Sequence, residues 1–272
     1  MQELTVSTGA MDNRGGTVGA KTTADLSTTS LDNREGGRLV SEGELRLHTG
    51  GLQNSHGQIQ SVGDILFDSV PQVYARVKPG DVNSAGALIA GRDMVMKLDG
   101  DLFNSGKLAG KQTVQLSAEN IHNQAGTIQG ANVSLTARTD INSTGGLLQA
   151  TDSLLAMAGR DINLTTTTRT AQSDAGQNHF ERTSIDSVVG VYVQNDQGRL
   201  VLQAGRDMNL TAATVVNSGK GSLTQLSAGR DMTLSTVTTS AQDNITWIKI
   251  IVCHRAPHRV RAARLPVTVM SR

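Results

Sequence analysis

The sequence predicts an all-β protein, a right-handed parallel β-helix made of coils of about 20 residues. Three observations predict this fold class. A glycine followed two residues later by an apolar residue returns at a nearly fixed interval, asparagine and glycine gather at the same point of each interval, and apolar and polar residues alternate between them. The handedness follows from the crossover preference of parallel strands and not from the repeat itself. A leucine-rich repeat is the competing solenoid of this period, but its signature is absent.

Residues 1–149 carry the regular coils, in which the repeat glycines are 21, 20, 29, 20, 20 and 20 residues apart. Asn and Gly tolerate the left-handed backbone of tight turns, so we expect both at the corners. The expected turn residues are Asn13, Gly16, Asn33, Gly37, Asn54, Gly57, Asn83, Gly86, Asn104, Gly106, Asn123, Gly126, Asn142 and Gly146. The interval of 29 contains two prolines and predicts an insertion at about 68–81.

Residues 150–243 continue with a less regular unit, Ala-Gly-Arg-Asp followed by a strand-like Thr-rich stretch. Its expected turn glycines are Gly159, Gly205 and Gly229, and their uneven spacing predicts an excursion at about 170–198. Residues 244–272 are basic and have no repeat register, which predicts a disordered or frameshifted tail that does not continue the helix. The repeat count predicts roughly twelve coils and a rod on the order of 60 Å long.

The composition limits the classes of function. Only 3 Phe, 2 Tyr and 1 Trp accompany 29 Gly, which predicts a thin aliphatic core and no aromatic ligand pocket. Residues 1–243 are mildly acidic and lack a basic stripe, so we expect no nucleic-acid partner. One Cys excludes a disulfide framework within the chain. No apolar run is long enough for a transmembrane segment, and we recognise no export signal within these residues.

One arrangement raises the alternative of a β-helix carbohydrate-active enzyme, because such chemistry needs carboxylates clustered on neighbouring coils. Asp12 and Asp32 lie one repeat apart and are expected to stack. The later coils place other residue types in that row, namely Gln53, Val82, Phe103 and His122. We therefore expect an architectural row of turn residues and no catalytic residue.

Two further patterns suggest ion binding. The Arg-Asp pairs Arg92/Asp93, Arg160/Asp161, Arg206/Asp207 and Arg230/Asp231 lack the calcium-binding nonapeptide pattern and are interpreted as local, solvated charge pairs. Cys253, His254 and His258 could ligate a metal but lie in the irregular tail. We expect no metal-binding residue, no cofactor-binding residue and no cofactor.

The Asn-x-x-Gly-x-Ile coils and the stretch RTSIDSVVGVYVQNDQGRLVLQAGRDMNLTAA at residues 182–213 carry a resemblance. They resemble the haemagglutinin repeats of filamentous haemagglutinin-type exoproteins, most of all the stalks of contact-dependent growth inhibition toxins. The resemblance covers roughly residues 1–243. We expect neither a two-partner secretion domain nor a toxin domain within this chain.

The resemblance implies a protein secreted by, or held on the surface of, a Gram-negative bacterium. The full-length protein would use an outer-membrane two-partner secretion transporter as a partner, and a target-cell surface receptor or glycan is a further expected partner. The predicted function is a non-catalytic structural stalk segment of an adhesin or a contact-dependent inhibition toxin. Adhesive contacts are expected in the two inserted segments, since function concentrates on loops.

Overall fold

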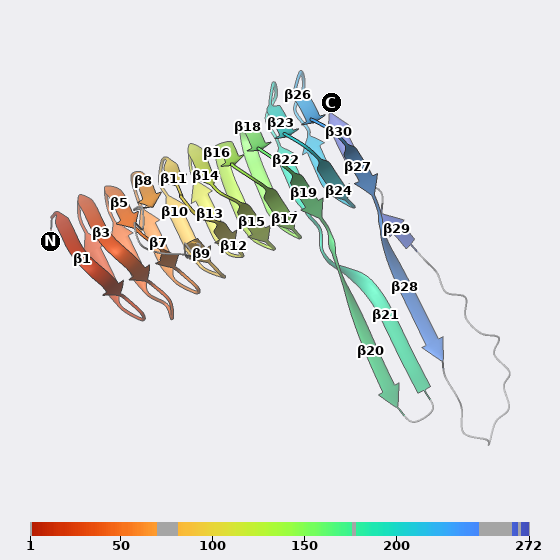
Figure 1. Ribbon diagram of the computed structural model, residues 1–272, viewed down its shortest axis with the longest axis horizontal. Coiled ribbons are helices and arrows are strands. Elements are labelled where there is room, and N and C mark those ends of the chain that lie inside the picture. Colours follow the sequence, from red (N-terminus) through yellow and green to blue (C-terminus); the bar gives the residue numbers. More distant parts are fainter. Residues whose placement is uncertain (1, 70–80, 176–177, 245–262, 266–267, 272) are drawn as a thin grey trace.

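The computed structural model describes residues 2–69, 81–175, 178–244, 263–265 and 268–271. Every regular element in these ranges is a β-strand, and the strands stack in parallel into a β-solenoid of about ten turns. Figure 1 shows the solenoid as an elongated rod that begins at the N-terminus and carries a projection near its other end. The predicted parallel β-helix is confirmed, with about ten coils in place of the roughly twelve expected.

Each full coil contributes one strand to each of three columns, which we call the first, second and third sides. The first side consists of β2 (Thr17–Ala20), β4 (Arg38–Ser41), β7 (Gln58–Ser61), β10 (Ala87–Ala90), β13 (Lys107–Gly110), the start of β16 (Thr127–Ala137), the start of β18 (Leu147–Ala158), β22 (Gly190–Val193) and β25 (Thr214–Asn217). The second side consists of the start of β3 (Thr23–Asp32), β5 (Glu44–Thr49), β8 (Ile65–Ser69), β11 (Met94–Lys97), β14 (Thr113–Ala118), the ends of β16 and β18, β23 (Arg199–Ala204) and β26 (Leu223–Ala228). The third side consists of the end of β3, β6 (Leu52–Gln53), β9 (Asp81–Asn83), β12 (Leu102–Asn104), β15 (Ile121–Gln124), β17 (Ile141–Thr144), β19 (Ile162–Thr165), β24 (Met208–Thr211) and β27 (Met232–Ser235). β1 (Leu4–Asp12) pairs along the whole of β3 at the N-terminal end of the rod.

The core is a stack of aliphatic side chains, one above another. Along the second side one inward row reads Leu45, Ile65, Met94, Val114, Val133, Leu154 and Leu200, each paired with its neighbour one coil away and each at most 2% exposed. Phe67 is the only aromatic residue in the core as the structure describes it. Because strand residues alternate between the two faces, this inward spacing leaves Ser, Thr, Gln and charged residues on the outside.

A projection leaves the solenoid at the corner that follows the third side. β20 (Thr167–Ala175) and β21 (Asn178–Ser187) form an antiparallel hairpin, and β28 (Val237–Asn244) adds to its free side by pairing with β21. Figure 1 shows these three strands extending well beyond the rod. The excursion expected at 170–198 therefore spans Thr167–Ser187 as a hairpin, and the chain returns to the first side at Gly190.

Two expected features lie wholly or partly outside the described residues. Most of the insertion expected at 68–81, residues 70–80, is not described. Of the tail, β29 (Ala263–Leu265) pairs antiparallel with β28, and β30 (Thr268–Ser271) pairs in parallel with β25 of the first side. The expectation that the tail does not continue the helix is wrong for Thr268–Ser271, because a short strand of any sequence can pair through its backbone. In the ranges described, no helix is long and apolar enough to cross a membrane.

Candidate functional site

A buried row of asparagines lines the corner between the third and first sides. Its members are at most 6% exposed, although asparagine is usually a surface residue. The amide Nδ2 of each donates to the Oδ1 of the next, at distances of 2.7 to 2.8 Å, in the order Asn13, Asn33, Asn54, Asn83, Asn104 and Asn123. Asn123 ends the row by donating to the Ser143 hydroxyl at 3.4 Å. This row is called the amide ladder below, and it satisfies polar groups that would otherwise be buried without partners.

Asn142 does not belong to the amide ladder. Its backbone pairs with His122, and Ser143 pairs with Asn123. Asn142 begins an outward row instead, accepting a hydrogen bond from Asn163 at 2.8 Å. Ser143, and not Asn142, pairs with Asn123, so Asn142 precedes the ladder position by one residue. A one-residue shift in a strand moves a side chain to the opposite face.

The repeat glycines act through close packing rather than through a left-handed backbone. At several corners the residue before the repeat glycine has the positive φ, as in His56 (φ 60°) and Ala85 (φ 50°). Gly57 does not, but a Cβ there would lie 2.0 Å from the Asn33 carbonyl oxygen and 2.3 Å from Asn54 Oδ1. All of the glycines expected at the corners are positions where an added Cβ would come within 3 Å of the amide ladder or the preceding coil, namely Gly16, Gly37, Gly57, Gly86, Gly106, Gly126, Gly146, Gly159, Gly205 and Gly229.

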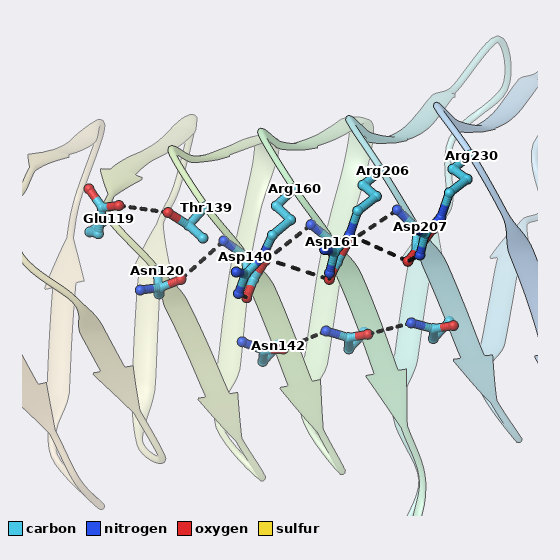
Figure 2. Close-up of polar contacts among 12 residues, drawn as sticks. Glu119, Asn120, Thr139, Asp140, Asn142, Arg160, Asp161, Arg206, Asp207 and Arg230 are labelled. Atoms are coloured by element: carbon cyan, nitrogen blue, oxygen red, sulfur yellow. Dashed lines mark hydrogen bonds and ion pairs between the residues drawn. The ribbon is translucent and has the colours of Figure 1, made fainter.

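A second ladder runs along the corner between the second and third sides (Figure 2). Arg160 donates from Nε to Asp140 Oδ1 at 2.8 Å, Arg206 to Asp161 at 2.8 Å and Arg230 to Asp207 at 2.9 Å. Each arginine also donates from its terminal Nη2 to the other oxygen of the same carboxylate. Each arginine binds the aspartate of the preceding coil in the bidentate geometry typical of guanidinium and carboxylate. It also lies 3.2 to 3.8 Å from the aspartate that follows it in sequence, so the expected local pairs are present but are the longer contacts of this Arg–Asp ladder.

The aspartates of the Arg–Asp ladder also hold the backbone of the next coil. Asp140 Oδ1 accepts from the Asp161 N–H at 3.1 Å, and Asp161 Oδ1 accepts from the Asp207 N–H at 3.2 Å. The side-chain hydrogen bond from Arg206, helped by this backbone contact, lowers the pKa of the Asp161 carboxyl, and Arg160 acts likewise on Asp140. The stacked carboxylates therefore need no bridging cation, because an arginine separates each from the next.

Arg92 and Asp93 repeat the same letters at a different place. They lie at the corner between β10 and β11, so between the first and second sides. Arg92 binds Asp64 of the preceding coil at 2.8 Å, and Asp93 Oδ1 accepts from the Thr113 N–H at 2.9 Å. The motif thus serves two corners by the same mechanism.

The two stacked carboxylates suggested for catalysis are each occupied by an arginine. Asp12 pairs with Asp32 in register, as the spacing predicted. The side-chain hydrogen bond from Arg14 lowers the pKa of Asp12 to about 2, and the one from Arg34 lowers the pKa of Asp32. A general acid needs a raised pKa, so neither carboxyl is suited to protonate a glycosidic oxygen. The remainder of the row follows the predicted order Gln53, Val82, Phe103 and His122.

That row contains a feature that the sequence reasoning passed over. The rings of Phe103 and His122 stack with centroids 4.7 Å apart and an interplanar angle of 6°. They border a shallow groove of about 260 Å³ whose lining also includes Ser84, Ser105 and Gln124. The signal was available, since an exposed aromatic residue in an outward row of a chain with so few aromatics is unusual.

The projection carries a cluster of ionisable groups at its tip. His179 Nδ1 lies 2.5 Å from Asp174 Oδ1, and His179 Nε2 lies 3.9 Å from Glu181 Oε2. The hydrogen bond that His179 makes to the Asp174 carboxylate raises the pKa of His179. Among the described residues there is no group of three or more His, Cys, Asp or Glu placed to hold a metal ion. Cys253, His254 and His258 lie outside the described residues.

A family model described as the haemagglutinin repeat matches residues 1–35, 20–70, 79–187 and 186–249, which is most of the chain. The chain belongs to the haemagglutinin-repeat family. In this chain the repeats are thus the coils of the solenoid, and their recurring Asn, Gly, Arg and Asp residues form its ladders and corners.

The curated relatives are much longer proteins than this chain. The chain is 32% identical over 179 residues to the "Toxin CdiA" of Yersinia pestis, an alignment that covers 64% of this chain and 5% of the relative. It is 29% identical over 212 residues to the "Deoxyribonuclease CdiA" of Dickeya dadantii, covering 77% of this chain and 6% of the relative. The chain thus spans about a twentieth of the length of the relatives that it matches. No solved structure matches it.

Proposed function

We propose that this chain is a non-catalytic segment of a surface-exposed stalk, which holds a distal part of a larger exoprotein away from the cell that secretes it. The observation that supports this most directly is the use of its polar side chains. In the amide ladder and the Arg–Asp ladder, the side-chain donors and acceptors form hydrogen bonds between one coil and the next. Such contacts stabilise a rod and occupy the polar side chains of both ladders.

The relatives support the same proposal. Their names describe toxins and nucleases, and the alignments cover only 5–6% of their length, within a chain that is repeat throughout most of its length. Any killing activity would belong to another part of such a protein. By the same likeness, the full-length protein would be exported by an outer-membrane two-partner transporter and reside at the surface of a Gram-negative bacterium. In that setting the projecting strands β20, β21 and β28 would be suited to meet a target-cell receptor.

Removal of one coil tests the proposal. Deleting the 21 residues Ile141–Asp161 joins Asp140 to Ile162, which places Asp140 where Asp161 lay and offers it to Arg206. A stalk should then refold and become shorter by one strand spacing, about 4.8 Å. Paired spin labels at exposed positions on either side of the deletion would measure this change, in a background where Cys253 is replaced.

A second variant, Asp12→Asn, separates the stalk from the alternative of a carbohydrate-active enzyme. Reducing-end release from a panel of polysaccharides, with and without Ca²⁺, should be at background for both the intact chain and Asp12→Asn. Release by the intact chain that disappears in Asp12→Asn would overturn the non-catalytic assignment. A deletion variant that loses its β-sheet circular dichroism would overturn the interchangeable role of the coils.

A further inference from the structure

The groove beside Phe103 and His122 differs from the rest of the solenoid surface. It lies on the third side, where β9, β12 and β15 each contribute one outward residue and one corner residue. Part of its lining is Val82 with the stacked rings of Phe103 and His122, while Ser84, Asn104, Ser105 and Gln124 add hydroxyl and amide groups. Phe103 remains 38% exposed, which makes it one of the few large hydrophobic side chains that the described fold leaves open to solvent.

The chemistry of this lining indicates the class of ligand. No lining residue carries a carboxylate, an ammonium or a guanidinium group. Both Ser84 and Ser105 line the groove, and the Ser105 hydroxyl donates to the Ser84 hydroxyl at 3.0 Å, so the pair keeps the Ser84 O–H as a donor and lone pairs on both oxygens as acceptors. A pyranose ring has the matching character, with apolar C–H faces and a rim of neutral hydroxyl groups.

The geometry also favours a glycan over an extended peptide. A peptide usually binds to a β-protein by adding to a free sheet edge. Here β12 pairs with β9 on one side and with β15 on the other, so the groove floor offers no unpaired backbone edge. A glycan needs only side-chain contacts, and the coils repeat at about 4.8 Å, close to the advance of one sugar residue in an extended chain.

The surface beyond the groove continues the same chemistry along the rod. The outward row proceeds from His122 to Asn142, Asn163 and Asn209, whose amides are joined at 2.8 Å (Figure 2). The neighbouring corner row proceeds from Gln124 to Thr144, Thr165 and Thr211. A linear ligand seated in the groove would therefore meet uncharged amide and hydroxyl groups for several further coils.

We infer that the third side is a binding face for a neutral linear glycan, with Phe103 and His122 as its apolar anchor. The glycan lies along the rod axis, and its hydroxyl groups exchange hydrogen bonds with Ser84, Ser105 and Gln124. The inference rests on the proposed function only in that the stalk must be exposed at the cell surface to meet such a chain.

Saturation-transfer NMR and titration calorimetry test the inference on the full chain, with neutral linear hexasaccharides of glucose, mannose and N-acetylglucosamine as probes and a hyaluronan hexasaccharide as the acidic comparison. We expect binding of at least one neutral probe, about tenfold weaker in Phe103→Ala, as for loss of an aromatic anchor. Met157→Ala is the matched control, because Met157 is also 38% exposed but lies outward on the second side. Circular dichroism confirms that both variants keep the fold.

Three outcomes would overturn the inference: no neutral probe binds, only the acidic probe binds, or Phe103→Ala binds as tightly as the intact chain. Each would leave the coil-deletion result unaffected, so a failed binding face can be told from a failed stalk assignment. Loss of binding in Met157→Ala as well would also contradict the assignment to the groove.

Discussion

Replacement of Asn54 by alanine should weaken the solenoid more than its small change in volume suggests. Asn54 is fully buried, donates from Nδ2 to Asn83 Oδ1 at 2.8 Å and accepts from Asn33 Nδ2 at 2.7 Å. In Asn54→Ala the Asn33 amide keeps its hydrogen bond to the Gly37 carbonyl at 3.0 Å, whereas Asn83 Oδ1 loses its donor in a buried place. An unsatisfied buried group costs about 1–3 kcal/mol, and the space left by the amide adds to this, so we expect roughly 3 kcal/mol.

The control is Asn142→Ala, in the half-buried outward row. Asn142 accepts a single hydrogen bond from Asn163 at 2.8 Å, and water can replace it, so the expected loss is below about 1 kcal/mol. Urea unfolding followed by circular dichroism gives the total change, and amide hydrogen exchange shows whether the loss is confined to the coils around β6 and β7, as nearest-neighbour stacking predicts. Equal losses for the two variants would refute the argument that the amide ladder is stabilised by burial.

Two further predictions follow from the corners. Gly57→Ala should lower the free energy of unfolding by about 3 kcal/mol, because the added Cβ would lie 2.0 Å from the Asn33 carbonyl oxygen. Gly9→Ala is the control, because a Cβ at Gly9 would have nothing within 4 Å, and it should change the free energy of unfolding by less than about 0.5 kcal/mol. Equal urea midpoints for the two variants would contradict the close-packing role of Gly57. Asp161→Asn tests the Arg–Asp ladder. The pKa of the Asp161 carboxyl is lowered from 3.8 in the folded chain, so the carboxylate stabilises the fold at any pH above 3.8. This contribution is lost as the pH falls through the pKa of the folded chain. The difference in urea midpoint between the intact chain and Asp161→Asn should therefore be largest near neutral pH and smaller at a pH of about 3. The control is Asp231→Asn, because the Asp231 side chain is 71% exposed and its replacement should change the midpoint little at either pH. A midpoint difference for Asp161→Asn that is constant with pH would contradict the role of the Arg–Asp ladder.

The sequence was sufficient to predict the fold because the coil is encoded many times. Recurrence of Gly16, Gly37 and Gly57 at about 20 residues carried the period, and alternation in segments such as Glu44–Thr49 carried the strands. A single occurrence of the repeat motif could have been interpreted either as a turn or as a binding or catalytic site. Repetition averages out such local ambiguity, which is why the architecture could be derived without a solved relative.

The partners of polar side chains could not be predicted in the same way. The sequence places Arg160 next to Asp161, and the structure pairs it with Asp140, 20 residues earlier, because neighbours one coil away are as close as neighbours in sequence. The asparagines expected at the corners likewise have their partners one coil away, in a buried ladder. Whether Asn142 or Ser143 would point inward depended on a one-residue register that neither composition nor period determines.

The corner from which the projection leaves shows how a solenoid of repeated coils can accommodate a segment that is not part of the repeat. Leu164 takes the inward place where earlier coils have an asparagine, and Thr166, two residues later at the corner, is 2% exposed. Its hydroxyl donates to the Ala212 carbonyl at 2.7 Å and accepts from the Val189 N–H at 3.1 Å, so it joins the strand that leaves, the strand that returns and the next coil. The hairpin Thr167–Ser187 is thereby inserted without interrupting the core, since Leu148 pairs directly with Val191 after it. A corner that is closed by one side chain tolerates an insertion of any length, and this separates the stability of the stalk from the sequence of whatever it presents.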